Sequence, residues 1–282
     1  MMKHIPVMID DVMTMIGDID GRRVLDATFG AGGYSRRFLE SGAYVTAFDR
    51  DPNVAPDANK MTNDFGERFR FINQPFSKMS ELNEHFDAIV FDLGISSMQI
   101  DNPERGFSFR ADAPLDMRMS GDGPTICDMF EQWTAPEIVR ILRDFGDIKP
   151  ATAIANAIKQ QMPQTTFELR DLIHNPRDIA PVFQALRIAL NDEMGELKRA
   201  LESVPTLLKV GGRCLCVTFH SIEDRIVKNT FRDWTTPHGD PRMPVCDTPC
   251  FQLLHARTPS NAEISANSRA RSAHLRGVAK SC

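Results

Sequence analysis

The stretch that most constrains the fold is Val24–Gly33, with the sequence Val-Leu-Asp-Ala-Thr-Phe-Gly-Ala-Gly-Gly. A short apolar run predicts a buried strand, the glycines predict a tight turn, and residues 34–40 are typical of a helix start. Glycine lets a backbone approach a ligand closely, and a helix start offers free N–H groups. This pattern predicts the opening of a nucleotide-type α/β fold, although a glycine loop alone could equally be an ordinary left-handed turn.

An acidic residue at the end of the next predicted strand favours the ligand-binding interpretation. Residues 44–48, Tyr-Val-Thr-Ala-Phe, form this strand and Asp49 follows it. In folds of this type an acid at that position accepts hydrogen bonds from ribose hydroxyls. The glycine loop and Asp49 together predict a cofactor that contains adenosine.

Two further strands are predicted to end at the same edge of the sheet. Residues 68–73 alternate between apolar and polar, and Phe86–Asp92 is the clearest buried strand of the chain. Phe76, after the third strand, could flank an adenine ring, but the spacing alone favours a core residue. Asp92 ends the fourth strand, so we expect the ligand to lie across these carboxyl ends.

The pattern changes after the fourth strand. Residues 101–119 are rich in turn residues and arginine, and residues 125–209 show helical periodicity broken by prolines. We therefore predict a helical domain, residues 105–208, inserted into an α/β domain made of residues 1–104 and 209–282.

The sheet is predicted to resume at Gly211, where an apolar strand runs to His220. The segments that begin at Phe251 and His274 are expected to be the last two strands, paired as a hairpin. The basic stretch 269–276 either contacts nucleic acid or forms a solvated edge strand, and composition does not separate the two. The net charge of −5 argues against a nucleic-acid binder that is basic overall.

Six scattered cysteines are typical of reduced, intracellular usage rather than of a disulfide framework. Cys246 and Cys250 could bind a metal, but no matching second pair follows, so no metal is expected. No apolar run is long enough to cross a bilayer, and the N-terminus lacks the layout of a secretory signal. We expect a cytoplasmic protein without a membrane partner.

The glycine loop differs from that of dinucleotide enzymes, which follow the pattern G-x-G-x-x-G. Here Ser35 stands in place of the third glycine, and Asp26 precedes the loop, as is common in methyltransferases. The loop therefore favours S-adenosylmethionine as the cofactor.

Several blocks resemble one family, the bacterial 16S rRNA (cytosine-N4) methyltransferases, also called the RsmH/MraW family. The blocks are His4-Ile-Pro-Val, Asp26-Ala-Thr-Phe-Gly-Ala-Gly-Gly, Asp49-Arg-Asp-Pro, Asp92-Leu-Gly-Ile-Ser-Ser-Met-Gln-Ile-Asp, Glu104-Arg-Gly-Phe-Ser-Phe, Pro114-Leu-Asp-Met-Arg-Met, Phe183-Gln-Ala-Leu-Arg-Ile, Phe219-His-Ser-Ile-Glu-Asp-Arg-Ile-Val-Lys and Arg269-Ala-Arg-Ser-Ala-His-Leu-Arg. The resemblance runs nearly from end to end, and several of these blocks are not general methyltransferase sequence.

The resemblance implies a class I methyltransferase domain interrupted by a helical substrate-recognition domain. It implies transfer of a methyl group from S-adenosylmethionine to the N4 amine of a P-site cytosine, position 1402 in standard rRNA numbering, in the small ribosomal subunit. The implied cofactor contacts are Gly32, Gly33, Tyr34, Asp49, Phe76, Asp92 and Gln99. Tyr34 replaces a histidine usual in the family, and Asn156 stands where an arginine is common.

The candidate catalytic residues are Asp116, which could accept a hydrogen bond from the amine, and His220, which could accept its proton. Each has a structural alternative: Asp116 could pair with Arg118, and His220 could be a satisfied polar residue at a strand end. Two other functions stay open, a methyltransferase of another RNA base or amine and a non-catalytic RNA-binding assembly factor. The oligomeric state is not predicted.

Overall fold

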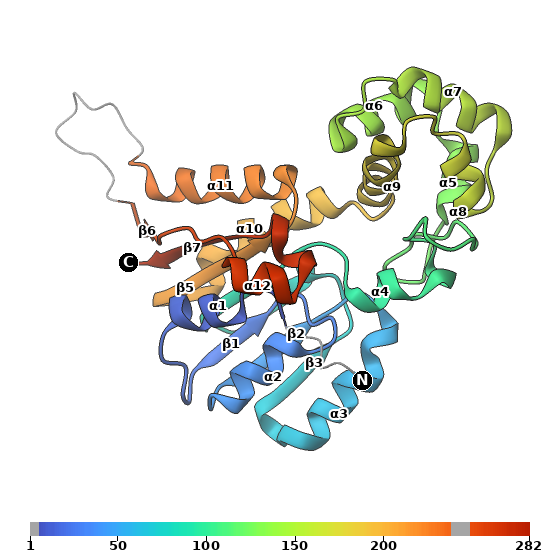
Figure 1. Ribbon diagram of the computed structural model, residues 1–282. Helices are drawn as coiled ribbons and strands as arrows, with labels where there is room; N and C mark the ends of the chain where they lie inside the picture. Colours follow the sequence, from blue (N-terminus) through green and yellow to red (C-terminus); the bar gives the residue numbers. More distant parts are fainter. Residues whose placement is uncertain (1–5, 238–248) are drawn as a thin grey trace, which may run out of the picture. The chain divides into compact units, whose positions relative to one another are not determined.

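The computed structural model describes residues 6–237 and 249–282, and the contacts divide the chain into two compact units (Figure 1). The first unit comprises Met1–Gly94 and Glu196–Cys282, and the second comprises Ile95–Gly195. The insertion therefore begins and ends about ten residues earlier than residues 105 and 208. At its far end the reason is visible, because residues 197–204 pack into the core of the sheet unit.

The first unit contains a seven-stranded sheet with the order β3-β2-β1-β4-β5-β7-β6. The strands are β1 (Arg23–Asp26), β2 (Tyr44–Phe48), β3 (Phe69–Ile72), β4 (Phe86–Asp92), β5 (Leu208–Thr218), β6 (Phe251–Leu253) and β7 (His274–Lys280). β1 to β5 are mutually parallel, whereas β7 runs antiparallel to β5 and β6. The predicted mostly parallel α/β sheet is confirmed, including the pairing of the last two strands.

The strand order places the predicted ligand edge at the centre of the sheet. β1 pairs with β2 on one side and with β4 on the other, so the connections after β1 and β4 diverge to opposite sides. Ligands of open parallel sheets bind at such a switch point, outside the carboxyl ends of the strands. Asp26, Asp49, Asp92 and Thr218 lie at or just after these ends.

Helices cover both faces of this sheet (Figure 1). The helices of the unit are α1 (Ile9–Ile16), α2 (Gly33–Glu40), α3 (Ala55–Phe65), α10 (Glu193–Leu207), α11 (Ser221–Thr235) and α12 (Asn261–Ala266). One face is buried under α10 and α11, where Leu201 and Phe231 pack in one cluster with Ile89 and Phe91 of β4. Alternate residues of a strand point to the same face, which explains why these two β4 side chains share one core.

The second unit is helical, as predicted. Its helices are α4 (Ser97–Asp101), α5 (Ile126–Gln132), α6 (Ala135–Gly146), α7 (Ala151–Gln161), α8 (Thr166–Asp171) and α9 (Pro176–Leu190). Thr125, Thr134 and Thr165 each begin a helix with a reciprocal capping box, in which the threonine side chain accepts from a backbone N–H. Ile138, Leu142 and related apolar side chains at helical spacing form a core of its own. No helix among the described residues is long and apolar enough to span a membrane.

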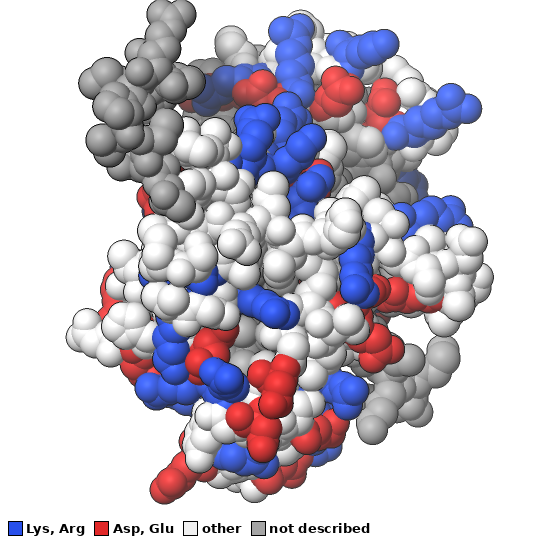
Figure 2. Space-filling view, turned by 90° about the vertical axis from the view of Figure 1, so that its left-hand side faces the viewer, with Lys and Arg blue, Asp and Glu red and all other residues white. Residues whose placement is uncertain are grey.

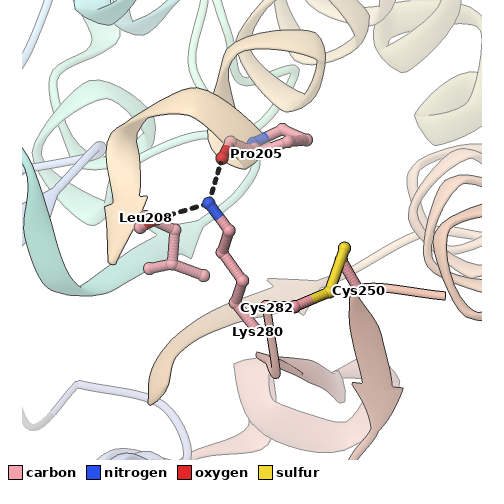
Figure 3. The surroundings of a disulfide bond; sticks show 5 residues. All are labelled: Pro205, Leu208, Cys250, Lys280 and Cys282. Carbon is pink, nitrogen blue, oxygen red and sulfur yellow. Dashed lines mark hydrogen bonds between the residues drawn. A yellow bond between two sulfur atoms is a disulfide. The ribbon is translucent and has the colours of Figure 1, made fainter. Parts of the chain in front are cut away.

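The C-terminal end of the sheet corrects the expectation for the cysteines. Cys250, just before β6, and Cys282, just after β7, form a disulfide with a Cα–Cα distance of 4.9 Å (Figure 3). The antiparallel pairing of β6 with β7 brings the two together, so reduced usage was a wrong prediction for this pair. Cys214 and Cys216 are free and buried as predicted, and Cys246 lies outside the described residues. The described residues contain no group of three or more metal-ligating side chains.

Lys280, near the end of β7, links this strand to the connection between α10 and β5. Its ammonium donates to the carbonyl oxygens of Pro205, at 2.7 Å, and Leu208, at 3.0 Å, where α10 ends and β5 begins (Figure 3). A lysine at this position donates to carbonyl oxygens that have no N–H donor at the end of the helix.

Candidate functional site

The buried carboxylate of Asp26, the last residue of β1, accepts hydrogen bonds from both ends of the glycine loop. Its Oδ1 accepts from the backbone N–H of Thr28 at 3.1 Å, and its Oδ2 accepts from the Ser35 hydroxyl at 2.6 Å. Asp26 and Ser35 are both fully buried. Burial raises the pKa of Asp26 to about 6, although the hydrogen bonds from Ser35 and Thr28 oppose this rise. At the position of the third glycine of a dinucleotide loop, Ser35 thus supplies a hydroxyl that donates to Asp26.

The loop is also bonded to the residue after β2. The Gly30 N–H donates to Asp49 Oδ2 at 2.7 Å, and the Asp51 N–H donates to Asp49 Oδ1 at 2.8 Å. Burial raises the pKa of Asp49 to about 6 against these two bonds. The structure thus brings together the glycine loop and the acid that the sequence paired with it.

Asp92, at the end of β4, is the third acid of this edge. Its backbone N–H donates to the Thr28 hydroxyl at 2.7 Å, which joins β4 to the glycine loop. Its carboxylate Oδ1 is buried and has no hydrogen-bond partner among the described residues. Burial, and then the charges of Asp26 and Glu223, raise the pKa of Asp92 well above its usual range. A buried acceptor without a donor is a position for a ligand group that donates.

The two glycines of the predicted set begin α2. Gly32 precedes the helix with φ of +74°, and a Cβ there would lie 2.6 Å from Met61 Cε and 2.8 Å from the Phe29 ring. Gly33 and Tyr34 are the first two helical residues, so their N–H groups have no acceptor within the helix. The loop therefore presents backbone donors close to the three carboxylates.

The side chains of Tyr34 and Phe76 take part in packing. The Tyr34 ring is buried against Phe38, and its hydroxyl donates to the Val7 carbonyl oxygen. Tyr34 is therefore left with its backbone N–H for a ligand. Phe76 is half-buried after β3 and contacts Phe91 edge to face at a centroid distance of 5.8 Å, so it packs on the core beside the ligand edge.

Gln99 belongs to the helical unit, where it is the third residue of α4. Its side-chain oxygen accepts from the Ser96 N–H at 3.0 Å, and its own N–H donates to the Ser96 hydroxyl at 3.2 Å. This capping box fixes Gln99 as a buried residue of the helix start.

His220 lies after β5 and caps the first turn of α11. Its Nδ1 accepts from the Glu223 N–H at 3.4 Å, and its Nε2 lies 3.0 Å from Glu223 Oε1. Glu223 Oε2 in turn accepts from the N–H groups of Phe219 and His220. His220 is thus at the same carboxyl edge as Asp92, held by a structural capping box.

Glu223 is the residue of this edge that sequence reasoning missed. It is buried, with 2% exposure, and its charge is one cause of the raised pKa of Asp92. An acid three residues after a capping residue, as in His-Ser-Ile-Glu, is the pattern that could have identified it.

Asp116 lies in the second unit and pairs with Arg118. Its Oδ1 accepts from Arg118 Nε at 2.9 Å and its Oδ2 accepts from Arg118 Nη2 at 2.6 Å. Burial would raise the pKa of Asp116, but the Arg118 hydrogen bonds outweigh it, and the pKa is lowered. The structural alternative considered from the sequence, an Asp116–Arg118 pair, is thus present.

Comparison with known proteins gives the same assignment over the whole chain. The family model described as the MraW methylase family matches residues 1–281. The chain belongs to the MraW methylase family. Two relatives are each named "Ribosomal RNA small subunit methyltransferase H". The one from Chelativorans sp. (strain BNC1) is 41% identical and covers 98% of this chain and 86% of its own length. The one from Caulobacter sp. (strain K31) is 42% identical and covers 98% of this chain and 92% of its own.

Family membership confirms the resemblance, the class I methyltransferase fold and S-adenosylmethionine as the cofactor. Among solved structures, an rRNA methylase from Streptococcus thermophilus is 16% identical, covers 100% of this chain and 99% of its own, and has a TM-score of 0.44.

Proposed function

We propose that this protein methylates the exocyclic N4 amine of a P-site cytosine of 16S rRNA within the small ribosomal subunit. The observation that carries the proposal is the carboxyl edge of the sheet, where Asp26, Asp49 and Asp92 are bonded to one glycine loop. The names of the relatives, which describe small-subunit rRNA methyltransferases, support the substrate class. Such a substrate would place the enzyme with the ribosomes in the cytoplasm.

The residues of this edge fit S-adenosylmethionine. Asp49 offers carboxylate oxygens to ribose hydroxyls, and the first-turn N–H groups of Gly33 and Tyr34 offer donors. Asp92 Oδ1 offers an acceptor without a partner to a ligand donor. Gln99 and Phe76 complete the proposed set of cofactor contacts. When bound, S-adenosylmethionine supplies a methyl group that its sulfonium has already activated.

The protein then has two tasks, to hold the cytosine amine and to let a proton leave. The amine is a weak nucleophile because its lone pair is delocalised into the ring, so positioning supplies much of the acceleration. The base has to leave its stack to reach the cofactor. We assign the helical unit, through Asp116, to the holding of the amine, and His220 to the acceptance of its proton.

The geometry favours His220 as the proton acceptor over Asp116. His220 lies at the same carboxyl edge as Asp92. Because its Nδ1 accepts from the Glu223 N–H, neutral His220 carries its proton on Nε2, 3.0 Å from Glu223 Oε1, and Nδ1 would have to leave the cap to accept the proton of the amine. Asp116 is paired twice with Arg118 and its pKa is lowered, which suits a hydrogen-bond acceptor rather than a base.

Mass mapping of 16S rRNA from a strain that lacks this chain tests the substrate. The proposal predicts that one N4-methylcytosine is lost and that the purified protein restores it to small subunits from that strain. Loss of a methyl group at another base, or on a protein, would assign the chain to the alternative of a different methyltransferase. Cofactor binding without any transfer would favour an assembly factor.

Two conservative variants test the roles. His220→Asn keeps a side chain that caps helices well but removes the base, so the single-turnover rate should fall while the unfolding free energy stays within about 1 kcal/mol. Asp116→Asn should lower the single-turnover rate, because the amine loses a charged hydrogen-bond acceptor. Neither role stands if both variants transfer the methyl group at the wild-type rate. Unchanged calorimetric binding of S-adenosylmethionine would show that the cofactor site is intact.

A further inference from the structure

A row of cations lies along the exposed side of α11, outside the proposed cofactor site. Arg225, Lys228 and Arg232 are all exposed. Their spacing of three and four residues places them within about 60° of one another around the helix, over a length of about 10 Å. We call these three residues the α11 ridge. Figure 2 looks onto the side at which α11 ends; Lys and Arg side chains lie above the centre of that view, with Asp and Glu side chains among them.

The ridge is not neutralised by acidic neighbours. Within the described parts of the chain, Arg225 and Lys228 have no ion pair, and Arg232 donates to the amide oxygen of Asn229 at 3.2 Å. Asp224, directly before Arg225, is already held by Arg276 of β7 at 2.7 and 2.8 Å. Asp233 follows Arg232 directly and so points about 100° further round the helix.

Several other exposed cations of this unit differ in this respect. Ion pairs are formed by the exposed side chains of Arg22, Arg23, Arg70, Lys78 and Arg199. In a chain with a net charge of −5, a row of cations without acidic partners is a local positive field that attracts a polyanion.

The ridge starts at the ligand edge of the sheet. Two residues separate the end of β5 from the start of α11, and the register pairs Thr218 of β5 with His274 of β7. Just before β7, the short helix Ser268–Ser272 carries Arg271, which is exposed and has no ion pair among the described residues. Arg271 lies in this short helix and not in a strand, so the alternative of a solvated edge strand does not apply to it.

We propose that the α11 ridge, continued by Arg271, binds the sugar-phosphate backbone of the RNA that carries the target base. This inference rests on the proposed function, since it names a second RNA contact of the same enzyme on its sheet unit. Arg and Lys bind phosphates through charge and hydrogen bonds without regard to sequence. The ridge would therefore add affinity and orientation, while the choice of base is made elsewhere.

The test compares Arg225→Gln/Lys228→Gln with Arg37→Gln/Lys60→Gln. Arg37 and Lys60 are exposed on α2 and α3 of the same unit and likewise lack ion pairs in the described structure, so the control removes an equal charge. Kd for small subunits and for protein-free 16S rRNA is measured from 50 to 200 mM salt, with KM and kcat for methyl transfer. Binding of S-adenosylmethionine checks that both variants are folded.

Two phosphate contacts contribute about 1.4 to 1.8 to the slope of log Kd against log salt concentration. Between about 50 and 200 mM salt, the affinity of the wild type should therefore fall about 7- to 12-fold more than the affinity of the ridge variant. KM should rise for the ridge variant with kcat little changed, and the control should match the wild type. Equal slopes for both variants would overturn the proposal. A defect that is confined to small subunits and absent with protein-free rRNA would also overturn it, in favour of a ribosomal protein as partner. Failure of the wild type to methylate small subunits would refute the proposed function instead, because the salt slopes need no methyl transfer.

Discussion

The bond from Ser35 to Asp26 gives the sharpest quantitative prediction, because both groups are fully buried and 2.6 Å apart. Ser35→Ala removes the donor and leaves a carboxylate with one acceptor position unfilled. A hydrogen bond to a charged group contributes about 1.5–3 kcal/mol, and one between neutral groups about 0.5–1.5 kcal/mol. Since the pKa of Asp26 is about 6, Asp26 is ionised at pH 8 and protonated at pH 4.5. The loss in unfolding free energy should therefore be about 1.5–3 kcal/mol at pH 8 and roughly half of that at pH 4.5.

Urea titrations of the wild type and Ser35→Ala at the two pH values measure this difference. Acids that Asp26 does not influence titrate equally in both proteins, so their contributions cancel. Ser41→Ala is the control, because its half-buried hydroxyl bonds only to the Arg37 carbonyl oxygen at the other end of α2, and it should cost less than about 0.5 kcal/mol. In an Asp26→Asn background the cost of Ser35→Ala should no longer depend on pH. A loss that is equal at pH 4.5 and 8, or below about 0.5 kcal/mol at pH 8, would refute the reasoning.

Three further predictions concern the loop, the acid after β2 and the disulfide. Gly32→Ala places a Cβ 2.6 Å from Met61 Cε at φ of +74°, so it should cost at least about 1–2 kcal/mol in urea and weaken cofactor binding measured by calorimetry. Below pH 6 the carboxyl of Asp49 becomes protonated, so cofactor affinity should fall from pH 7 to 5, and Asp49→Asn should reduce that dependence. Cys282→Ser opens a loop with a sequence separation of 32 residues and should lower the unfolding free energy by about 3–4 kcal/mol under oxidising conditions, with no loss when reductant is present.

The architecture was predictable because its patterns are local. Val24–Gly33 carries its strand, turn and helix start within ten residues, and Phe86–Asp92 is apolar enough to be a buried strand without context. The approach of Asp49 to Gly30 followed from topology, since parallel strands end at one edge. The helical unit followed from periodicity between its prolines, although its boundaries depend on which core each helix contacts.

Long-range partners were not predictable from the sequence. The disulfide between Cys250 and Cys282 arises from the pairing of β6 with β7, which places distant residues in contact. The fixing of Asp116 by Arg118 needs only neighbouring residues, and it was foreseen as an alternative to a catalytic role. Sequence patterns give the type of a residue and its place on an element, whereas the partner of a side chain depends on the assembled fold.

The acids of the carboxyl edge explain what kind of ligand this edge accepts. Burial raises the pKa of Asp26, Asp49 and Asp92, and the charge of Asp26 raises the pKa of the other two further. Ionised Asp49 and Asp92 are therefore destabilised by the charge of Asp26, and a cationic ligand would relieve that cost while an anionic one would add to it. Phosphate-bearing dinucleotides are disfavoured by this field, whereas S-adenosylmethionine, with a sulfonium and an ammonium group, is favoured. A glycine loop of this kind could bind a dinucleotide or S-adenosylmethionine, and the carboxylates bonded to it favour S-adenosylmethionine.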